Sequence, residues 1–514
     1  MSAAGLINNA IPQLVIPPPS IARHPETIVK PRELKSWLAD LPVTDTRQQA
    51  EQLHRQLKLL IRDPKSGPQY AELLRLYHPL LQGLQEQVWT NLCVSGHGPA
   101  TEDQLQTTVS QLLLEISCGH MRLINESITA GKQPAAENIY HAMLPLCRLL
   151  HWDLLQYNLV RPSIWRQVLQ LFAIGELYAL NGQQQSSSFH LPEDARTSHG
   201  VFFSTLVTLL CDPYRLPASQ LAQLIKGLGK ASEHLRVNTS GEANYRVAVD
   251  LSGRLPPLRY ARLQQQQQQN EQYLQLDEFF IQFDRLGLPG DSIRLVQWLI
   301  GSLRDLALKP KGREARRHIR IKREANYHFV HGLEKVHERL TEIQQGTQKP
   351  QAQDNASAGI VIGGTSQNVS VELGTPCRQL DYSESGAGFM LGTNAQAPTV
   401  GCLVLMESDQ PGGNATNRWF AGTVRRRLKF DHQGTEIGVE KLQGNIVPVT
   451  FGLDQKPGLL QVQREQHVFR LVAPPNTFTG PGEQTLKGPE NEINVIFEEL
   501  LDNNTADIIR VSLV

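Results

Sequence analysis

The chain has 514 residues, of which 40% are hydrophobic and 19% are charged, and its formal net charge is zero because 50 basic residues balance 50 acidic ones. One hydrophobic core does not normally serve a chain of this length, so at least two domains are expected. The charge balance argues against a protein that coats nucleic acid or an acidic membrane surface. We therefore expect no nucleic-acid polymer as a partner.

The cysteines and the apolar runs predict where the protein is found. Its six cysteines are scattered without CxxC spacing, which indicates reduced thiols and neither a disulfide framework nor a zinc site. No basic-then-apolar leader opens the sequence. The strongest apolar run, Val201–Leu210, has half of the roughly 20 residues that a membrane-spanning helix needs. These features predict a soluble, cytoplasmic protein without a transmembrane segment.

Residues 1–30 form a proline-rich lead-in, and residues 31–310 are expected to form a mainly helical domain. Apolar residues recur there at helical spacing. The clearest stripes are Tyr70–Leu92, Asp103–Ala130, Ala135–Leu159, Ser163–Asn181, Ser198–Leu210 and Pro217–Leu235. Consecutive amphipathic helices pack either as an antiparallel bundle or as a superhelical array, and the absence of a fixed repeat leaves both open. Trp89, Trp152 and Trp165 are predicted core anchors.

The helical pattern is interrupted in the last third of this domain. Alternating residues near Asn244–Leu251 predict a hairpin or small sheet at about 240–258. The glutamine run near 264–270 is compatible with an exposed helix or a variable linker. Helical spacing then returns at Leu276–Leu286 and Asp291–Leu306. His141, His151 and Asp153 are too loosely spaced to indicate a metal site, and no metal ligands are predicted.

Two later motifs carry the candidate site. The first is basic: Arg316, Arg317 and Arg320 lie just before a run that alternates as a strand does. Guanidinium groups bind phosphate oxygens through paired hydrogen bonds and also stack on purine rings, so these arginines suit an anionic, aromatic ligand. The second motif offers a carboxylate, a hydroxyl and two glycines after a predicted strand. Its members are Asp381, Ser383, Gly386 and Gly388.

Together these motifs resemble the PilZ domain family, the bacterial receptor module for cyclic di-GMP. The family's Arg-x-x-x-Arg is matched by Arg316 and Arg320, and its Asp/Asn-x-Ser-x-x-Gly by Asp381, Ser383 and Gly386. Trp419–Arg427 and Thr435–Glu440 follow where the family has its later strands. The resemblance covers about residues 313–450. It implies an antiparallel β-barrel that binds cyclic di-GMP between the arginines and the second motif.

The expected fold class is therefore multidomain α + β, with an all-helical N-terminal domain followed by a PilZ-like antiparallel β-barrel. We assign the barrel to residues 311–475, with a flexible insertion near 344–375 that is rich in Gln, Ser, Asn and Gly. Residues 476–514 are expected to add a C-terminal β extension. Strand-like pieces after Glu440 lie beyond the family pattern and receive no role.

The sequence carries no catalytic constellation. It lacks the motifs of cyclic di-GMP synthases and phosphodiesterases, a phosphate loop and a GxSxG turn. We expect a non-enzymatic cyclic di-GMP receptor without other cofactors, acting in motility or biofilm regulation, whose helical domain binds a protein partner. One alternative is an interaction scaffold with a degenerate barrel that binds no nucleotide. Another is DNA binding by the basic stretch, which the zero net charge disfavours.

Overall fold

The computed structural model describes most of the chain and divides it into two compact units. The described residues are 14–64, 69–95, 100–185, 194–238, 246–249, 272–275, 321–347, 374–409, 419–430, 433–463, 468–489, 491–503 and 505–513. One unit comprises Met1–Tyr214 and Ala218–Ala315, and the other comprises Arg215–Pro217 and Arg316–Val514.

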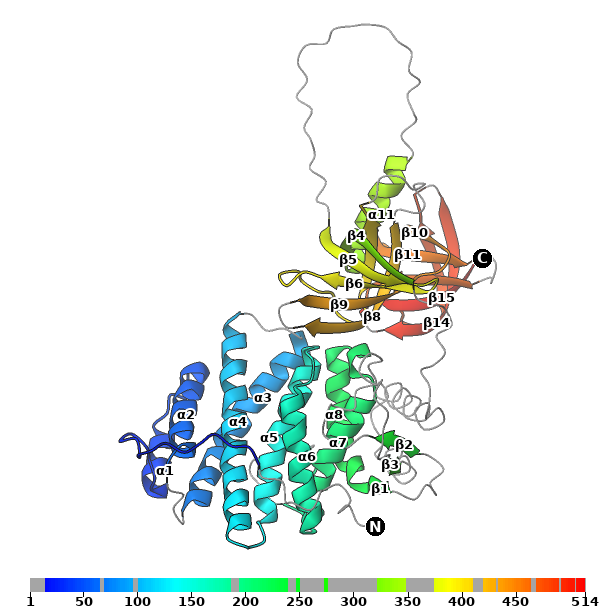
Figure 1. Cartoon of the computed structure of the whole chain (residues 1–514). Helices are drawn as coiled ribbons and strands as arrows, with labels where there is room; N and C mark the ends of the chain where they lie inside the picture. The colour runs from blue at the N-terminus through cyan, green and yellow to red at the C-terminus, as the bar shows by residue number, and fades with distance from the viewer. Residues whose placement is uncertain are drawn as a thin grey trace, which may run out of the picture. The chain divides into compact units, whose positions relative to one another are not determined.

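The first unit is built from helices that lie side by side (Figure 1). In the described residues they are α1 (Pro31–Ala39), α2 (Thr46–Ile61), α3 (Tyr70–Ser95), α4 (Ala100–Thr129), α5 (Ala136–Leu155), α6 (Pro162–Leu177), α7 (Ser198–Leu210) and α8 (Ala218–Ala231), with 3-10 turns at Pro213–Arg215 and Ser232–His234. Local signals begin several of them: proline opens α1 and α6. Asp45 and Thr197 cap α2 and α7 by accepting a backbone hydrogen bond at 2.9 Å. The predicted helical domain is confirmed.

Helix α5 is the centre of this unit. Nearly all of its residues are buried, and it packs against α3, α4, α6, α7 and α8. Because neighbours surround it, even its polar residues Arg148, His151 and Asp153 are buried, whereas a helix at the surface needs only one apolar stripe. The predicted anchors Trp89, Trp152 and Trp165 are all buried. No helix in the described part of the chain is long and apolar enough to cross a bilayer.

A small antiparallel sheet follows the helices. Its strands are β1 (Arg236–Asn238), β2 (Arg246–Val249) and β3 (Gln272–Gln275), in the order β1-β3-β2. Strand β2 falls within the segment predicted to be extended, and its partner is the distant β3. The glutamine run at 264–270 and the helices predicted at 276–286 and 291–306 lie outside the described residues.

The second unit begins with a closed antiparallel barrel in the order β4-β5-β6-β9-β8-β7. Its strands are β4 (Ile321–His331), β5 (Thr375–Tyr382), β6 (Gly386–Leu391), β7 (Leu403–Ser408), β8 (Trp419–Phe430) and β9 (Gly434–Lys441). Alternate residues of the strands fill its interior, among them Phe329, Phe389, Met406 and Ile437, all buried. The predicted antiparallel barrel is confirmed.

The strands beyond this barrel form a second closed barrel, in the order β10-β11-β12-β15-β14-β13. They are β10 (Asn445–Phe451), β11 (Lys456–Gln463), β12 (Val468–Ala473), β13 (Gly482–Lys487), β14 (Glu492–Asn503) and β15 (Asp507–Leu513). This differs from the expectation of one barrel over 311–475 with a β extension over 476–514. The reason is pairing: β10 closes on β13 and β12 on β15, so these strands surround a core of their own.

Helix α11 (Leu333–Thr347) lies between the two barrels, covering the start of the segment expected to be an insertion. The remainder of that segment, 348–373, is outside the described residues. Val336 and Leu340 of α11 are completely buried. They join one apolar cluster with residues of both barrels, namely Leu403, Leu405 and Ala421 of the first and Ile446, Leu459 and Val472 of the second. The helix is therefore a shared core element.

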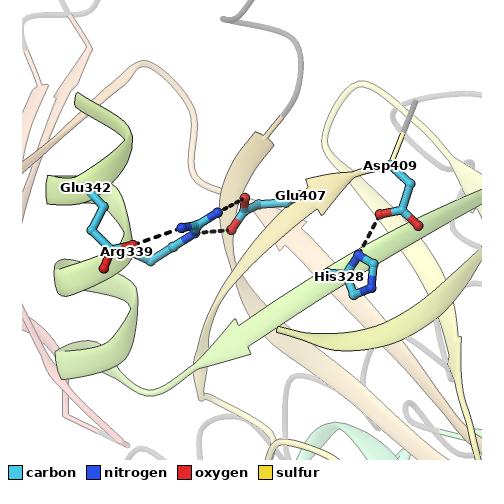
Figure 2. Close-up of polar contacts among 5 residues, drawn as sticks. All are labelled: His328, Arg339, Glu342, Glu407 and Asp409. Carbon is cyan, nitrogen blue, oxygen red and sulfur yellow. Dashed lines mark hydrogen bonds and ion pairs between the residues drawn. The ribbon is translucent and has the colours of Figure 1, made fainter. Parts of the chain in front are cut away.

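Helix α11 is also fastened to the first barrel by an ion pair. Figure 2 shows Arg339 of α11 reaching Glu407 of β7 through two hydrogen bonds of 2.8 and 2.9 Å, with a third of 2.8 Å to Glu342. The hydrogen bonds to Glu407 raise the pKa of Arg339. Planar, two-point recognition of a carboxylate is the geometry that arginine supplies and lysine does not.

We expect Arg339→Ala to lower the free energy of unfolding of the second unit by about 1–3 kcal/mol, since it removes a charge-assisted pair that is mostly shielded from solvent. Glu342→Ala is the matched control, because that carboxylate is largely exposed, and it should cost less than about 0.5 kcal/mol. A double-mutant cycle on Arg339 and Glu407, with urea unfolding as the readout, measures the coupling free energy between the two side chains. Equal losses for the Glu407 and Glu342 variants would contradict this assignment.

Candidate ligand-binding site

The second motif lies in the turn that joins β5 to β6. Asp381 is the penultimate residue of β5, and Gly386 begins β6. Ser383 closes the turn on itself, because its backbone N–H donates to the Gly386 carbonyl at 2.7 Å and its hydroxyl donates to the same oxygen at 3.1 Å. The hydroxyl is buried with its residue. In this structure Ser383 therefore shapes the turn.

Gly386 is required by the close approach of β6 and β9. A Cβ atom on Gly386 would overlap the carbonyl oxygen of Val439, its neighbour on β9. The backbone N–H of Lys441 also donates to the Ser385 carbonyl at 2.9 Å, which ties the end of β9 to the turn. The glycine of the motif thus has a steric role, and the turn has a fixed position at this end of the barrel.

Strand register places Asp381 in a row that crosses four further strands. Its Cα partners are Lys322 on β4 and Gly388 on β6. Gly388 pairs with Gly438 on β9, which pairs with Arg426 on β8. Two adjacent glycines therefore lie between an aspartate and an arginine. Glycine adds no side chain to the row, but both glycines are buried, and a Cβ atom on Gly438 would lie 3.5 Å from the Cβ atom of Arg426.

Three charged groups near this row were not among the predicted site residues. Arg426 pairs with Glu436, and Arg425 pairs with Glu440 at 2.6 Å. Lys441 lies with its ammonium 4.9 Å from the centre of the Phe420 ring, and burial lowers its pKa. Sequence spacing does not reveal these neighbours, because they meet only through the pairing of β8 and β9. The Ile-Gly-Val segment that contains Gly438 was the one local signal.

The predicted arginines Arg316, Arg317 and Arg320 lie outside the described residues. The described chain resumes at Ile321, the residue that follows Arg320. Ile321 pairs with Tyr382, and the next residue, Lys322, pairs with Asp381. The first motif is thus joined covalently to the strand end that pairs with the second motif.

A separate groove of about 450 Å³ opens on the first barrel away from this turn. Tyr327, Arg378, Met390 and Asp409 are among its lining residues, and none of the predicted site residues that the structure describes is. His328 and Asp409 are joined at 2.6 Å beside it (Figure 2). The groove and the Asp381 turn are therefore two distinct features of the barrel.

His151 and Asp153, which lie close to His141 in the sequence, each contact a different partner in the structure. His151 contacts the Thr205 hydroxyl at 3.3 Å, and Asp153 accepts from Arg161 at 2.9 Å. In the described residues, the group whose nitrogen ligands converge is His78, His120 and His141. His78 and His120 were not singled out by the sequence. The six cysteines, all within the described residues, form no disulfide.

The fold and the turn define a class of protein: a helical domain followed by antiparallel barrels, with a polar turn that contains glycine at one end of the first. Residues 32–241 match the family model described as "Cyclic-di-GMP receptor FimW, N-terminal domain". The matched range runs from α1 to just beyond β1 and ends before the barrels. No curated protein matches the chain. The helical domain is thus similar to a domain of a named cyclic di-GMP receptor.

Proposed function

We propose that this protein is a cytoplasmic cyclic di-GMP receptor that binds the nucleotide at its first barrel, a PilZ-like module. The observation that carries the proposal is the match of residues 32–241 to the N-terminal domain of a cyclic di-GMP receptor. It is independent of the barrel motifs, which lie wholly outside the matched range. Two separate parts of the chain therefore favour the same ligand.

The site would use the two motifs from opposite sides. Arg316, Arg317 and Arg320 would bind the phosphates and stack on the guanines, since guanidinium groups do both. Asp381 would accept hydrogen bonds from a guanine edge. Ser383 and Gly386 would hold the turn in place through the contacts described above.

The position of the arginines suggests how binding is transmitted. The boundary between the two compact units falls at Ala315 and Arg316, so the binding arginines begin the second unit where it leaves the first. Ordering of this segment by the ligand would change the relation between the units, a recognised form of switching. The helical domain would then present a surface to a protein partner in motility or biofilm control. The protein would act as a receptor and not as an enzyme.

Titration calorimetry of the full chain with cyclic di-GMP tests the proposal. We expect one or two ligands bound per chain with a dissociation constant in the low micromolar range or below. Asp381→Ala should weaken binding by about 10- to 100-fold, the value of one charge-assisted hydrogen bond. Asp409→Ala is the matched control, because this aspartate belongs to the separate groove, and it should bind as the parent does.

The outcome that counts against the receptor is the absence of heat with a folded parent chain. It would favour the alternative of an interaction scaffold whose barrel does not bind nucleotide. If the protein instead binds duplex DNA with an affinity that falls steeply as salt is added, the alternative of DNA binding by the basic stretch is favoured.

A further inference from the structure

Three buried histidines from three helices meet inside the helical domain. They are His78 of α3, His120 of α4 and His141 of α5. Their ligand nitrogens all lie within 4.8 Å of one another. The Nε2 atoms of His78 and His120 are 3.2 Å apart, and the His78 and His141 ring centres are 4.5 Å apart. We call these residues the histidine cluster.

Close packing of the helices creates the histidine cluster. Gly119 precedes His120 on α4, and a Cβ atom there would lie 2.8 Å from a methyl carbon of Leu74 on α3 and 2.7 Å from one of Ile61 on α2. Leu74 is one helical turn before His78. The missing side chain at Gly119 therefore lets α4 approach α3 closely at the level where His78 and His120 meet.

Each of two histidines has a polar partner behind it. His120 Nδ1 lies 3.1 Å from the Asn138 side-chain oxygen. An amide oxygen only accepts, so Nδ1 carries the proton and the His120 Nε2 lone pair faces His78. His141 Nδ1 lies 3.8 Å from Glu137, which is longer than a hydrogen bond, and Arg75 holds that carboxylate with a 2.9 Å hydrogen bond. A hydrogen bond from the far ring nitrogen to an oxygen, as in His120, orients the histidines of metal sites.

The burial of the cluster also suits a metal. All three histidines are almost completely buried. Three positive charges so close together in the core would be costly, and neutral imidazole is the form that coordinates metal ions.

We propose that the histidine cluster binds a divalent transition-metal ion of the Zn²⁺ type and thereby links α3, α4 and α5. Tetrahedral zinc at about 2.0–2.1 Å from each nitrogen requires ligand nitrogens about 3.3 Å apart. The His78–His120 separation of 3.2 Å already fits this requirement. The ligand nitrogen of His141 lies within 4.8 Å of the other two, so it would have to move closer to them by rotation of its side chain. Three neutral imidazoles leave a fourth position for water or another ligand.

The competing reading is a trio of packed, hydrogen-bonded core histidines. Metal retention by the full-length protein distinguishes the two. The purified chain is stripped with a chelator, incubated with Zn²⁺ and freed of loose metal by gel filtration, and its zinc is then counted by mass spectrometry. We expect about one Zn²⁺ per chain and a higher melting temperature with bound zinc. Co²⁺ in place of Zn²⁺ should give the intense visible absorption of a tetrahedral site.

Substitutions locate the ion. His78→Asn, His120→Asn and His141→Asn should each weaken Zn²⁺ binding by at least about 100-fold, more than the 10- to 100-fold expected for the outer partner in Asn138→Ala. His151→Asn is the matched control, because His151 is a buried histidine of α5 outside the histidine cluster. It should retain the full zinc content and the same Co²⁺ spectrum as the parent.

Two results would overturn the proposal. One is a folded parent chain that retains no zinc, and the other is retention that survives all three histidine substitutions. If those variants do not fold, the Co²⁺ spectrum of the parent decides: a six-coordinate spectrum, or none, rejects the site. Cyclic di-GMP plays no part in these measurements, so their outcome is separate from that of the nucleotide titration.

Discussion

Replacing Arg316 and Arg320 together by alanine is expected to weaken cyclic di-GMP binding by at least about 100-fold while both units stay folded. Each substitution removes a guanidinium and, with it, a charge-assisted hydrogen bond of about 1.5–3 kcal/mol. Two such losses give about 3–6 kcal/mol, and each 1.4 kcal/mol is a factor of ten in affinity. The same calorimetric titration measures the loss, with circular dichroism as the check on folding.

Two further variants sharpen this result. Arg316→Lys with Arg320→Lys keeps both charges but loses two-point binding and planar stacking, so it should fall between the parent and the alanine variant. Arg378→Ala removes an arginine that is about half exposed on β5 and lines the separate groove, and it should leave affinity unchanged. Parental affinity in the double alanine variant would reject the role given to the arginines.

Leu340→Ala should lower the free energy of unfolding of the second unit by about 2–5 kcal/mol, the range for truncating a fully buried leucine. Leu340 is completely buried and contacts the apolar cluster shared by the two barrels. The cavity would therefore affect both barrels. Hydrogen exchange followed by mass spectrometry should show faster exchange in β7 and in β10–β12 together.

Leu453→Ala is the control for this prediction, since it makes the same change at a fully exposed leucine of the second barrel. Its effect should stay within about 0.5 kcal/mol. Faster exchange confined to one barrel in the Leu340 variant would show that α11 belongs to that barrel alone.

The helices could be predicted from the sequence because their signals are local. The stripe at Ser198–Leu210 coincides with α7, and the stripe at Asp103–Ala130 lies within three residues of both ends of α4. The second barrel could not be predicted in the same way. The residues Val468–Val472 are strand-like, yet such a piece fits an extension of the first barrel as well as a strand of a new one. Only the pairing of β12 with β15 decides between them.

In the candidate site, too, local features could be predicted from the sequence, whereas features that depend on strand pairing could not. The Asp381–Gly386 turn is local, so its residue types and spacing predicted a compact turn at a strand end. The Gly388–Gly438 pair depends on register between strands that are about 50 residues apart in sequence. Arg426 joins this pair only through the pairing of β8 with β9. The histidine cluster is harder still, because His78, His120 and His141 come from three helices with no shared motif.

The position of the shared helix α11 in the sequence also affects how the protein folds during its synthesis. It ends at Thr347, whereas its apolar partners in the second barrel begin with β10 at Asn445. At about 5–20 residues per second, a ribosome needs on the order of ten seconds to add β10–β12 after α11. The first barrel can close within that interval, but one side of α11 stays uncovered in the nascent chain. The apolar side of α11 is therefore covered only when the second barrel is complete. Until then it can be bound by chaperones or by other nascent chains.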